Sequence, residues 1–304
     1  DNDCKACHNE IFEESESFIV FEIPELAFEA SELNAQWPED ARGTLTHFMI
    51  LLLASDPLFT EAVTDLEDYC DLSELNKTNT LKLIKSIKNL YFEIDNKGPI
   101  SLKQRLIKAF NCQFNDQGQS SCSINETELD QLVSLMPIQL LCEAKTRWFP
   151  KLDEEYKAES SHYCANNNHN SESDTGEWIL EELSIEYRPT KHNNPLIKTL
   201  LNLSSRELSS ALTEKTRLEL FNELISEDAS VQCSKCHSVE SVDAKNFKVN
   251  WPASDKSSTQ KEFIKFRHDA HIKYQDESIC NDCHQENSKD GYLDSYEDHN
   301  PLTF

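Results

Sequence analysis

One five-residue pattern, Cys-x-x-Cys-His, occurs three times and constrains the chain more than any other feature of the sequence. With 11 cysteines and 10 histidines among 304 residues, random placement would give roughly 0.01 occurrences of this pattern. Coincidence is therefore excluded. One copy lies near the start of the chain and two lie in its last quarter, at Cys4–Cys7–His8, Cys233–Cys236–His237 and Cys280–Cys283–His284.

The chemistry of covalent haem attachment requires these residue types at this spacing. Two thiols one helical turn apart can form thioethers with the two vinyl groups of haem, and the adjacent histidine can coordinate the iron from the proximal face. Three motifs therefore predict three haem c groups, each containing one iron. The predicted proximal ligands are His8, His237 and His284.

Paired cysteines also occur in zinc sites and in redox disulfides. The pairs at Cys233 and Cys280 could together form a four-thiolate zinc cluster. That interpretation leaves the histidine after each pair unexplained, and it gives the pair at Cys4 no partner. A thioredoxin-like disulfide would lie at a strand-to-helix turn in a βαβ pattern, which none of the three segments shows.

A longer pattern around the third motif resembles a known family, the multihaem c-type cytochromes with bis-histidine ligation. Phe266-Arg-His268-Asp-Ala-His271 precedes Cys280-Asn-Asp-Cys283-His284 by eight residues, which resembles the Phe-x-His-x-x-His and Cys-x-x-Cys-His unit of class III-like members. The resemblance covers residues 228–287 and the N-terminal motif. It implies that His268 ligates the haem of Cys280 and Cys283, and that His271 ligates the haem of Cys233 and Cys236.

Helix geometry independently supports two different irons for this pair. Residues three apart on a helix share a side but diverge, so His268 and His271 cannot reach opposite faces of one porphyrin. The chain contains enough histidines to supply a second ligand to each of the three haem irons. Only two methionines could compete as ligands, Met49 and Met136. Bis-histidine ligation is the expectation, and it gives iron at the reducing end of the c-type range.

Two histidines are candidates for the distal ligand of the N-terminal haem. His192 lies in the turn Tyr187-Arg-Pro-Thr-Lys-His192, and His47 opens an apolar segment that predicts the inner face of a helix. A single histidine in an apolar helix is more often a core residue than a ligand. Solvated side chains are expected for His162 and His169, and His299 could ligate a haem of a neighbouring subunit.

Apolar residues at helical spacing dominate the long stretch between the first two motifs. We predict a mainly α fold, a helical body with haem-binding loops and little regular sheet. Asn125 with Glu128 is a capping signal for one of the helices, and strict alternation is best at Phe18 to Phe21. The predicted helices span 44–69, 80–94, 101–110, 126–148 and 195–226, and residues 159–176 are expected to form a loop.

Three segments follow from the same patterns. Residues 1–30 are predicted to carry the N-terminal haem attachment site, residues 31–227 to form the helical body, and residues 228–304 to form a two-haem module.

Five cysteines lie outside the haem motifs: Cys70, Cys112, Cys122, Cys142 and Cys164. Cys112 and Cys122 are expected to form a short-loop disulfide, and Cys142 to pair with either Cys164 or Cys70. One cysteine is then left as a free thiol or an intermolecular link. Disulfides and haem attachment both belong outside the cytoplasm, which predicts a periplasmic, extracellular or cell-surface protein.

Charge and hydropathy exclude several partners. The formal net charge is −26, so nucleic acid and anionic membranes would repel the chain, and a charged partner should be basic. The longest apolar run, from Phe48 to Ala54, is far shorter than the roughly 20 residues of a membrane-spanning helix. We expect redox partner proteins, no nucleic acid and no membrane insertion.

These patterns favour electron transfer through three haems, each with two histidine ligands on its iron. Attachment sites near both ends of the chain, together with His299, also suggest self-assembly into an oligomer or a haem filament. The main alternative is a multihaem oxidoreductase in which one haem keeps an open coordination position. A third interpretation makes the helical body a docking module. Carbon monoxide, which binds an open haem and not a bis-histidine haem, separates the first two.

Overall fold

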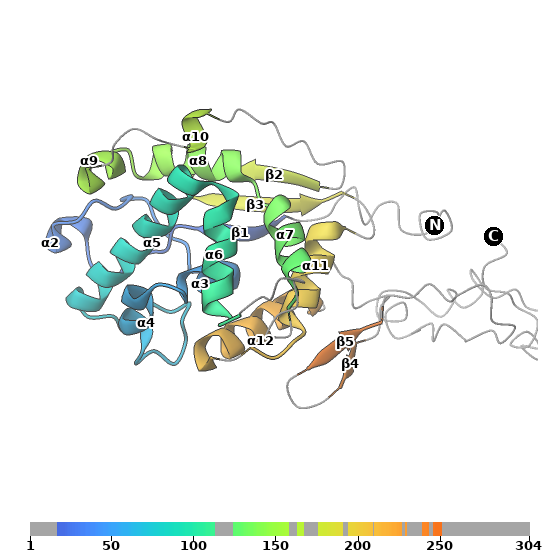
Figure 1. Cartoon of the computed structure of the whole chain (residues 1–304). Coiled ribbons are helices and arrows are strands. Elements are labelled where there is room, and N and C mark those ends of the chain that lie inside the picture. Colours follow the sequence, from blue (N-terminus) through green and yellow to red (C-terminus); the bar gives the residue numbers. More distant parts are fainter. Residues whose placement is uncertain are drawn as a thin grey trace, which may run out of the picture.

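The computed structural model describes residues 17–112, 124–157, 163–166, 176–190, 194–208, 210–226, 229, 239–242 and 246–250. Within these ranges, helices form most of the body, and the strands form one three-stranded and one two-stranded antiparallel sheet (Figure 1). The prediction of a mainly α chain with little sheet is confirmed. The loops predicted to bind haem lie outside the described residues.

The longest apolar run of the sequence forms the central helix α3 (His47–Leu53). Its last six residues, Phe48 to Leu53, are each at most 2% exposed, and burying such side chains contributes about 1.5–3 kcal/mol each. Thr46 fixes the start of the helix, because its Oγ1 accepts a hydrogen bond from the backbone N–H of Met49 and donates one to the carbonyl of Val20 at 2.6 Å.

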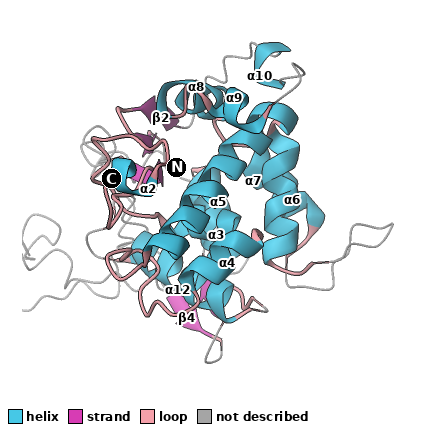
Figure 2. Cartoon of the chain, turned by 90° about the vertical axis from the view of Figure 1, so that its left-hand side faces the viewer, coloured by secondary structure: helices cyan, strands magenta, loops and turns pink. Residues whose placement is uncertain are grey.

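Two consecutive helices pack against α3. Helix α5 (Lys77–Lys97) and helix α6 (Pro99–Ala109) correspond to the helices predicted at 80–94 and 101–110. Gly98 separates them with a φ of +59°, and a side chain there would collide with the ring of Tyr163. Figure 2 shows α5 among α3, α6 and α4 (Pro57–Val63), which it contacts.

Three of the predicted helices are each broken into two. The segment 44–69 forms α3 and α4, because Asp56 caps α4 and Pro57 occupies its first position, where a missing N–H is harmless. The segment 126–148 forms α7 (Glu126–Ser134) and α8 (Ile138–Trp148), because Pro137 cannot continue a helix. The capping box of Asn125 and Glu128 is formed as predicted.

The third broken segment, 195–226, forms α11 (Pro195–Ser204) and α12 (Ala211–Ile225). Ser210 starts α12 by accepting a hydrogen bond from the N–H of Thr213 at 3.1 Å. Three short helices complete the described set: α2 (Ala30–Leu33), α9 (Leu152–Tyr156) and α10 (Tyr163–Asn166). The last lies in the segment predicted to be a loop.

The larger sheet has the strand order β1-β3-β2, with β1 (Phe18–Glu22), β2 (Gly176–Leu180) and β3 (Ser184–Pro189). The strand predicted at Phe18 to Phe21 is confirmed, whereas β2 and β3 were not predicted. Phe18 at the start of β1 lies opposite Tyr187 near the end of β3. The chain therefore enters β1 at the same end of the sheet at which it leaves β3.

The smaller sheet is a hairpin of β4 (Val239–Ser241) and β5 (Phe247–Val249) that contacts the helical body. The Phe247 ring stacks on Phe221 of α12 with centroids 4.8 Å apart, and the Phe247 N–H donates to the carbonyl of Ser205 at 2.8 Å. The body thus includes β1 from the first predicted segment and β5 from the last.

Among the described residues, no helix combines the length and the apolar character that crossing a bilayer requires.

Candidate functional site

His47 is the first residue of α3, and its side chain lies between α3, α12 and the loop that joins α4 to α5. The side chain is 22% exposed, whereas the sequence predicts a position on the inner face of a helix. Because His47 is the first helical residue, it lies outside the core that encloses Phe48 to Leu53. Its side chain faces the carboxylates of α12.

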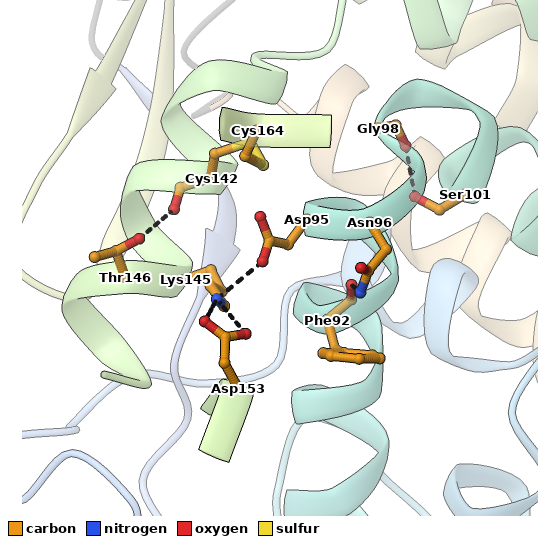
Figure 3. The surroundings of a disulfide bond; sticks show 10 residues. All are labelled: Phe92, Asp95, Asn96, Gly98, Ser101, Cys142, Lys145, Thr146, Asp153 and Cys164. Atoms are coloured by element: carbon orange, nitrogen blue, oxygen red, sulfur yellow. Dashed lines mark hydrogen bonds and ion pairs between the residues drawn. A yellow bond between two sulfur atoms is a disulfide. The ribbon is translucent and has the colours of Figure 1, made fainter. Parts of the chain in front are cut away.

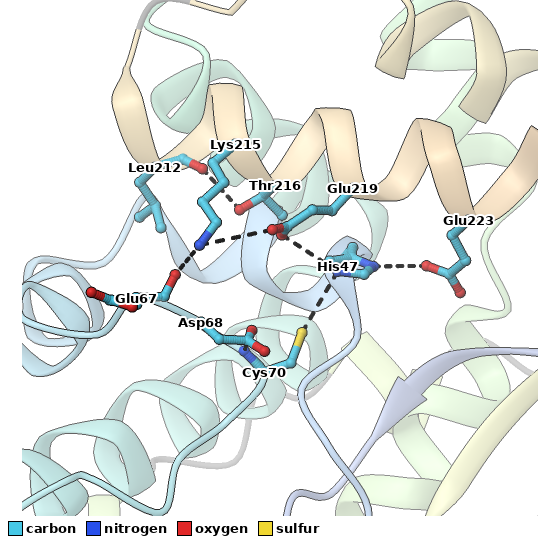
Figure 4. Close-up of polar contacts among 9 residues, drawn as sticks. All are labelled: His47, Glu67, Asp68, Cys70, Leu212, Lys215, Thr216, Glu219 and Glu223. Carbon is cyan, nitrogen blue, oxygen red and sulfur yellow. Dashed lines mark hydrogen bonds and ion pairs between the residues drawn. The ribbon is translucent and has the colours of Figure 1, made fainter.

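Both ring nitrogens of His47 have partners (Figure 4). Nδ1 donates to Oε2 of Glu223 at 2.7 Å. On the other side of the ring, Nε2 lies 3.5 Å from Oε2 of Glu219 and 3.6 Å from Sγ of Cys70. Glu219 and Glu223 are four residues apart on α12, so one turn of that helix holds a carboxylate at each side of the imidazole.

The loop between α4 and α5 positions Cys70 opposite His47. The backbone N–H of Cys70 donates to Oδ1 of Asp68 at 2.9 Å, which closes a local turn. Lys215 of α12 fastens the same loop, because its Nζ donates to the carbonyl of Glu67 and lies 4.7 Å from the centre of the Tyr69 ring. Lys215 also lies 3.8 Å from Glu219, so the loop and α12 are connected at the cluster.

These contacts change the protonation state of His47. Partial burial disfavours the charged imidazole, but hydrogen bonds to Cys70 and Glu223 outweigh it and raise the pKa of His47 to about 10. The ring is therefore an imidazolium at neutral pH, with a proton on each nitrogen. In this arrangement neither nitrogen offers a free lone pair to a metal, and no group of three ligating side chains with metal-site geometry occurs among the described residues.

Cys70 is also distinguished from the other described cysteines by its oxidation state. Cys142 and Cys164 form a disulfide (Figure 3), which is one of the two pairings predicted for Cys142 and excludes the pairing with Cys70. Cys112 is disulfide-bonded, and its predicted partner Cys122 lies outside the described residues. Cys70 is a free, half-buried thiol, so it is the cysteine that the predicted pairings leave over.

A groove of about 570 Å³ runs beside the Cys70 loop, between the end of α4, the end of α6 and the start of α12. Tyr69, the residue before Cys70, lines the groove, as do Leu212 of α12 and Lys108 of α6. A small molecule in the groove would therefore lie against the loop that carries the thiol.

A second basic residue lies between two carboxylates beside the Cys142–Cys164 disulfide. Nζ of Lys145 on α8 lies 2.9 Å from Asp95 of α5 and 2.6 Å from Asp153 of α9. Burial disfavours the charged amine, but the hydrogen bonds to Asp153 and Asp95 outweigh it and raise the pKa of Lys145. This pairing holds α5, α8 and α9 together.

Of the residues predicted from the sequence to form the functional site, His47 lies within the described part of the chain. All the other predicted haem-binding and iron-ligating residues lie outside it: Cys4, Cys7, His8, His192, Cys233, Cys236, His237, His268, His271, Cys280, Cys283 and His284. His162, His169 and His299 lie outside it as well.

Sequence reasoning did not identify the two glutamates that hold His47. Their i, i+4 spacing within a predicted helix was visible, but such pairs are frequent on solvated helix faces. Only the packing of α12 against α3 brings them to the imidazole.

The sequence matches no protein-family model, no curated protein and no solved structure. Function is therefore inferred from the residues of the chain itself.

Proposed function

We propose that the chain is a multihaem c-type cytochrome that transfers electrons through three covalently bound haems. The observation that carries this proposal is the threefold occurrence of Cys-x-x-Cys-His, with two thiols and an imidazole at the spacing that haem attachment requires. When bound, each haem would supply a one-electron iron couple. The thioether positions are Cys4, Cys7, Cys233, Cys236, Cys280 and Cys283, and the proximal ligands are His8, His237 and His284.

The distal ligands of the two C-terminal haems are assigned to His268 and His271. The assignment rests on the sequence resemblance, and it agrees with the divergence of two side chains three residues apart on a helix. His268 would serve the haem of Cys280 and Cys283, and His271 the haem of Cys233 and Cys236.

For the N-terminal haem, the register of the larger sheet supports His192. Because Phe18 of β1 pairs with Tyr187 of β3 in antiparallel register, the segments before β1 and after β3 leave the sheet at one end. His8 lies ten positions before Phe18, and His192 lies three positions after Pro189. An extended chain spans roughly 3.5 Å per residue, so a haem held at Cys4 and Cys7 would be within reach of His192.

His47, the competing ligand, is the weaker choice in this geometry. To bind iron it would have to lose a proton and give up its contact with either Glu223 or the pair of Glu219 and Cys70. We therefore assign the sixth ligand of the N-terminal haem to His192 and a separate role to His47.

Only a few residues separate the second haem motif from the described body on either side. Ala229 is 7% exposed and lies four residues before Cys233, and Val239, two residues after His237, opens the hairpin that contacts α12 and the end of α11. A haem at this motif would therefore be held near the body, which favours electron transfer between fixed centres.

The described disulfides support export. Cys142–Cys164 and the disulfide of Cys112 would not persist in a reducing cytoplasm, and haem attachment takes place in the same oxidising compartments. We place the protein in the periplasm or at the cell surface. Its net charge of −26 favours a basic redox partner.

The proposal is tested by counting haems as the pyridine haemochrome and by recording the reduced spectrum with and without carbon monoxide. Three haems per chain with no carbon monoxide shift support electron transfer through closed irons. A shift equivalent to one haem in three would support instead an oxidoreductase with an open haem. Bound zinc without haem would overturn the proposal.

The ligand assignment has its own test in two matched variants. His192→Ala should open one haem to carbon monoxide, whereas His47→Ala should leave all three closed. The reverse pattern would transfer the sixth ligand to His47. Self-assembly is tested separately by sedimentation, in which His299→Ala should dissociate any oligomer that depends on a ligand from a neighbouring subunit.

A further inference from the structure

We propose that Cys70, His47 and Glu223 form a thiol-exchange site at which Cys70 reacts with small, positively charged disulfides. The inference rests on described residues that are separate from the haem motifs, and it does not depend on the proposed electron transfer.

Three elements contribute the parts of an activated nucleophile. The α4–α5 loop supplies the thiol, α3 supplies an imidazole whose Nε2 lies 3.6 Å from Sγ, and α12 supplies the carboxylate that accepts a hydrogen bond from Nδ1 at 2.7 Å. A nucleophile, an adjacent nitrogen base and a group that orients the base are the arrangement that activates cysteine in enzymes. Cys70 thus has His47 beside its thiol, and Glu223 orients that histidine.

The protonated ring of His47 lies beside the sulfur of Cys70. With Nδ1 donating to Glu223, the N–H at Nε2 points toward the sulfur and can stabilise a thiolate there, and the thiolate is the nucleophile in exchange reactions. The groove beside Tyr69 and Leu212 provides space for a small reagent next to the loop.

The charges around the sulfur select the reagent. Asp68, Glu219 and Glu223 carry negative charge, and His47 and Lys215 carry positive charge on the α3 and α12 sides. With the reacting thiolate, four negative groups face these two positive ones, and Lys108 in the groove changes the net charge from −2 to −1. A cationic disulfide is attracted to this cluster and an anionic one is repelled.

The reaction is an exchange without any external oxidant. The Cys70 thiolate attacks one sulfur of the disulfide, a new bond forms to Sγ, and the original sulfur–sulfur bond breaks. Cys70 is oxidised to a mixed disulfide, while the departing half is reduced to a thiolate that takes a proton from Nε2 of His47. The imidazole regains that proton from solvent.

The experiment compares three disulfides on the full native chain: cystamine, which is cationic, hydroxyethyl disulfide, which is neutral, and glutathione disulfide, which is anionic. Adducts are measured by mass spectrometry and located by peptide mapping, with Cys70→Ser as the blank. We expect modification at Cys70 in the order cationic, neutral, anionic, with cystamine reacting about tenfold faster than glutathione disulfide at low ionic strength and less selectively at high salt.

Two variants test the roles of the neighbours. His47→Gln should slow the reaction with the neutral disulfide about tenfold, because the thiolate loses its cationic neighbour. Glu219→Gln should reduce the preference for cystamine, whereas Glu143→Gln, which removes one charge from an exposed position on α8, should leave it unchanged. Folding of each variant is checked by its circular dichroism.

Three results would overturn the proposal. Cys70 could stay unmodified by all three disulfides, it could react equally fast in His47→Gln, or Glu143→Gln could reduce the selectivity as much as Glu219→Gln. The order of the three reagents on the unmodified chain tests the proposal even if a variant fails to fold. Haem content is unaffected by any of these outcomes, so the thiol site and the electron-transfer function fail separately.

Discussion

The chain contains two clusters in which a basic side chain lies between two carboxylates close to cysteine sulfur, and the two differ in burial and oxidation. Lys145, with Asp95 and Asp153, is beside the closed Cys142–Cys164 disulfide (Figure 3). His47, with Glu219 and Glu223, is beside the free thiol of Cys70 (Figure 4).

The side chain of Lys145 is 7% exposed, and that of His47 is 22% exposed. A lysine between two carboxylates stays charged throughout the usual pH range, so the Lys145 cluster can act only as a fixed connection. A histidine titrates within an accessible range, and a free thiol can still react. The same charge pattern therefore stabilises the fold at Lys145, whereas at His47 it leaves a thiol that can react.

The largest expected effect tests the structural side of this comparison. Lys145→Met leaves Asp95, which is 4% exposed, without its cation, and breaking a buried pair in this way costs about 3–5 kcal/mol of unfolding free energy. Guanidinium denaturation measures the loss. Adding Asp95→Asn to Lys145→Met should recover part of it.

Arg147→Met is the matched control for that prediction. Arg147 lies on the same helix, its side chain is 56% exposed and its partner is Glu143, so the substitution should cost less than about 1 kcal/mol. Equal losses for Arg147→Met and Lys145→Met would remove the distinction between a buried and an exposed pair.

The second prediction concerns the disulfide next to Lys145. Replacing Cys142 and Cys164 together with alanine should lower the unfolding free energy, because the closed loop between them restricts the unfolded chain. For a sequence separation of 22 residues, loop-closure entropy gives about 3 kcal/mol. Denaturation without reductant measures the difference, and a loss below that of Cys70→Ala would contradict a structural role for this bond.

Much of the helical body could be predicted from the sequence, because apolar periodicity locates buried faces without knowledge of the fold. The predicted ranges 80–94 and 101–110 lie within or within one residue of α5 and α6. The breaks at Pro57 and Pro137 were missed because periodicity continued across them, although proline disfavours an uninterrupted helix. The strands β2 and β3 were not predicted. They pair with each other across a short turn, and only β3 pairs with β1, about 165 residues earlier in the sequence, a contact that no local pattern specifies.

The candidate sites divide in the same way. The Cys-x-x-Cys-His motifs are local, so the haem attachment proposed for them is predicted from neighbouring residues alone. The environment of His47 is tertiary: Cys70 is 23 residues away and Glu223 is 176 residues away, and no spacing rule connects them. The sequence identified His47 and the unpaired cysteine as separate candidates, and packing brings them together.

The third prediction uses pH to separate the two clusters. The pKa of His47 in the folded chain, about 10, is above its ordinary value of 6.5. Protonated His47 therefore stabilises the fold fully below pH 6.5, and this contribution declines as the pH rises and is lost above pH 10. A cation at a helix N-terminus is opposed by the helix dipole, so we expect a smaller contribution than that of the buried Lys145 pair.

His47→Gln provides the measurement. The difference in unfolding free energy between the parent chain and this variant should be greatest below pH 6.5 and should disappear near pH 10. Lys145→Met serves as the contrast, because its loss should change little over that window. A difference for His47→Gln that is independent of pH would show that the ring acts by packing and not by charge.

The smallest expected effect on stability is that of Cys70→Ser. The residue is half-buried and forms no disulfide, so its replacement should change the unfolding free energy by no more than about 0.5 kcal/mol. The same substitution should nevertheless lower the pKa of His47, because the hydrogen bond to Cys70 is one of the contacts that raise it. The hydrogen bond to Glu223 should still raise that pKa, and NMR titration of the imidazole in the parent and the variant measures both values. An unchanged pKa would mean that sulfur and imidazole do not interact, in which case His47 would resemble Lys145, a cation held by carboxylates alone.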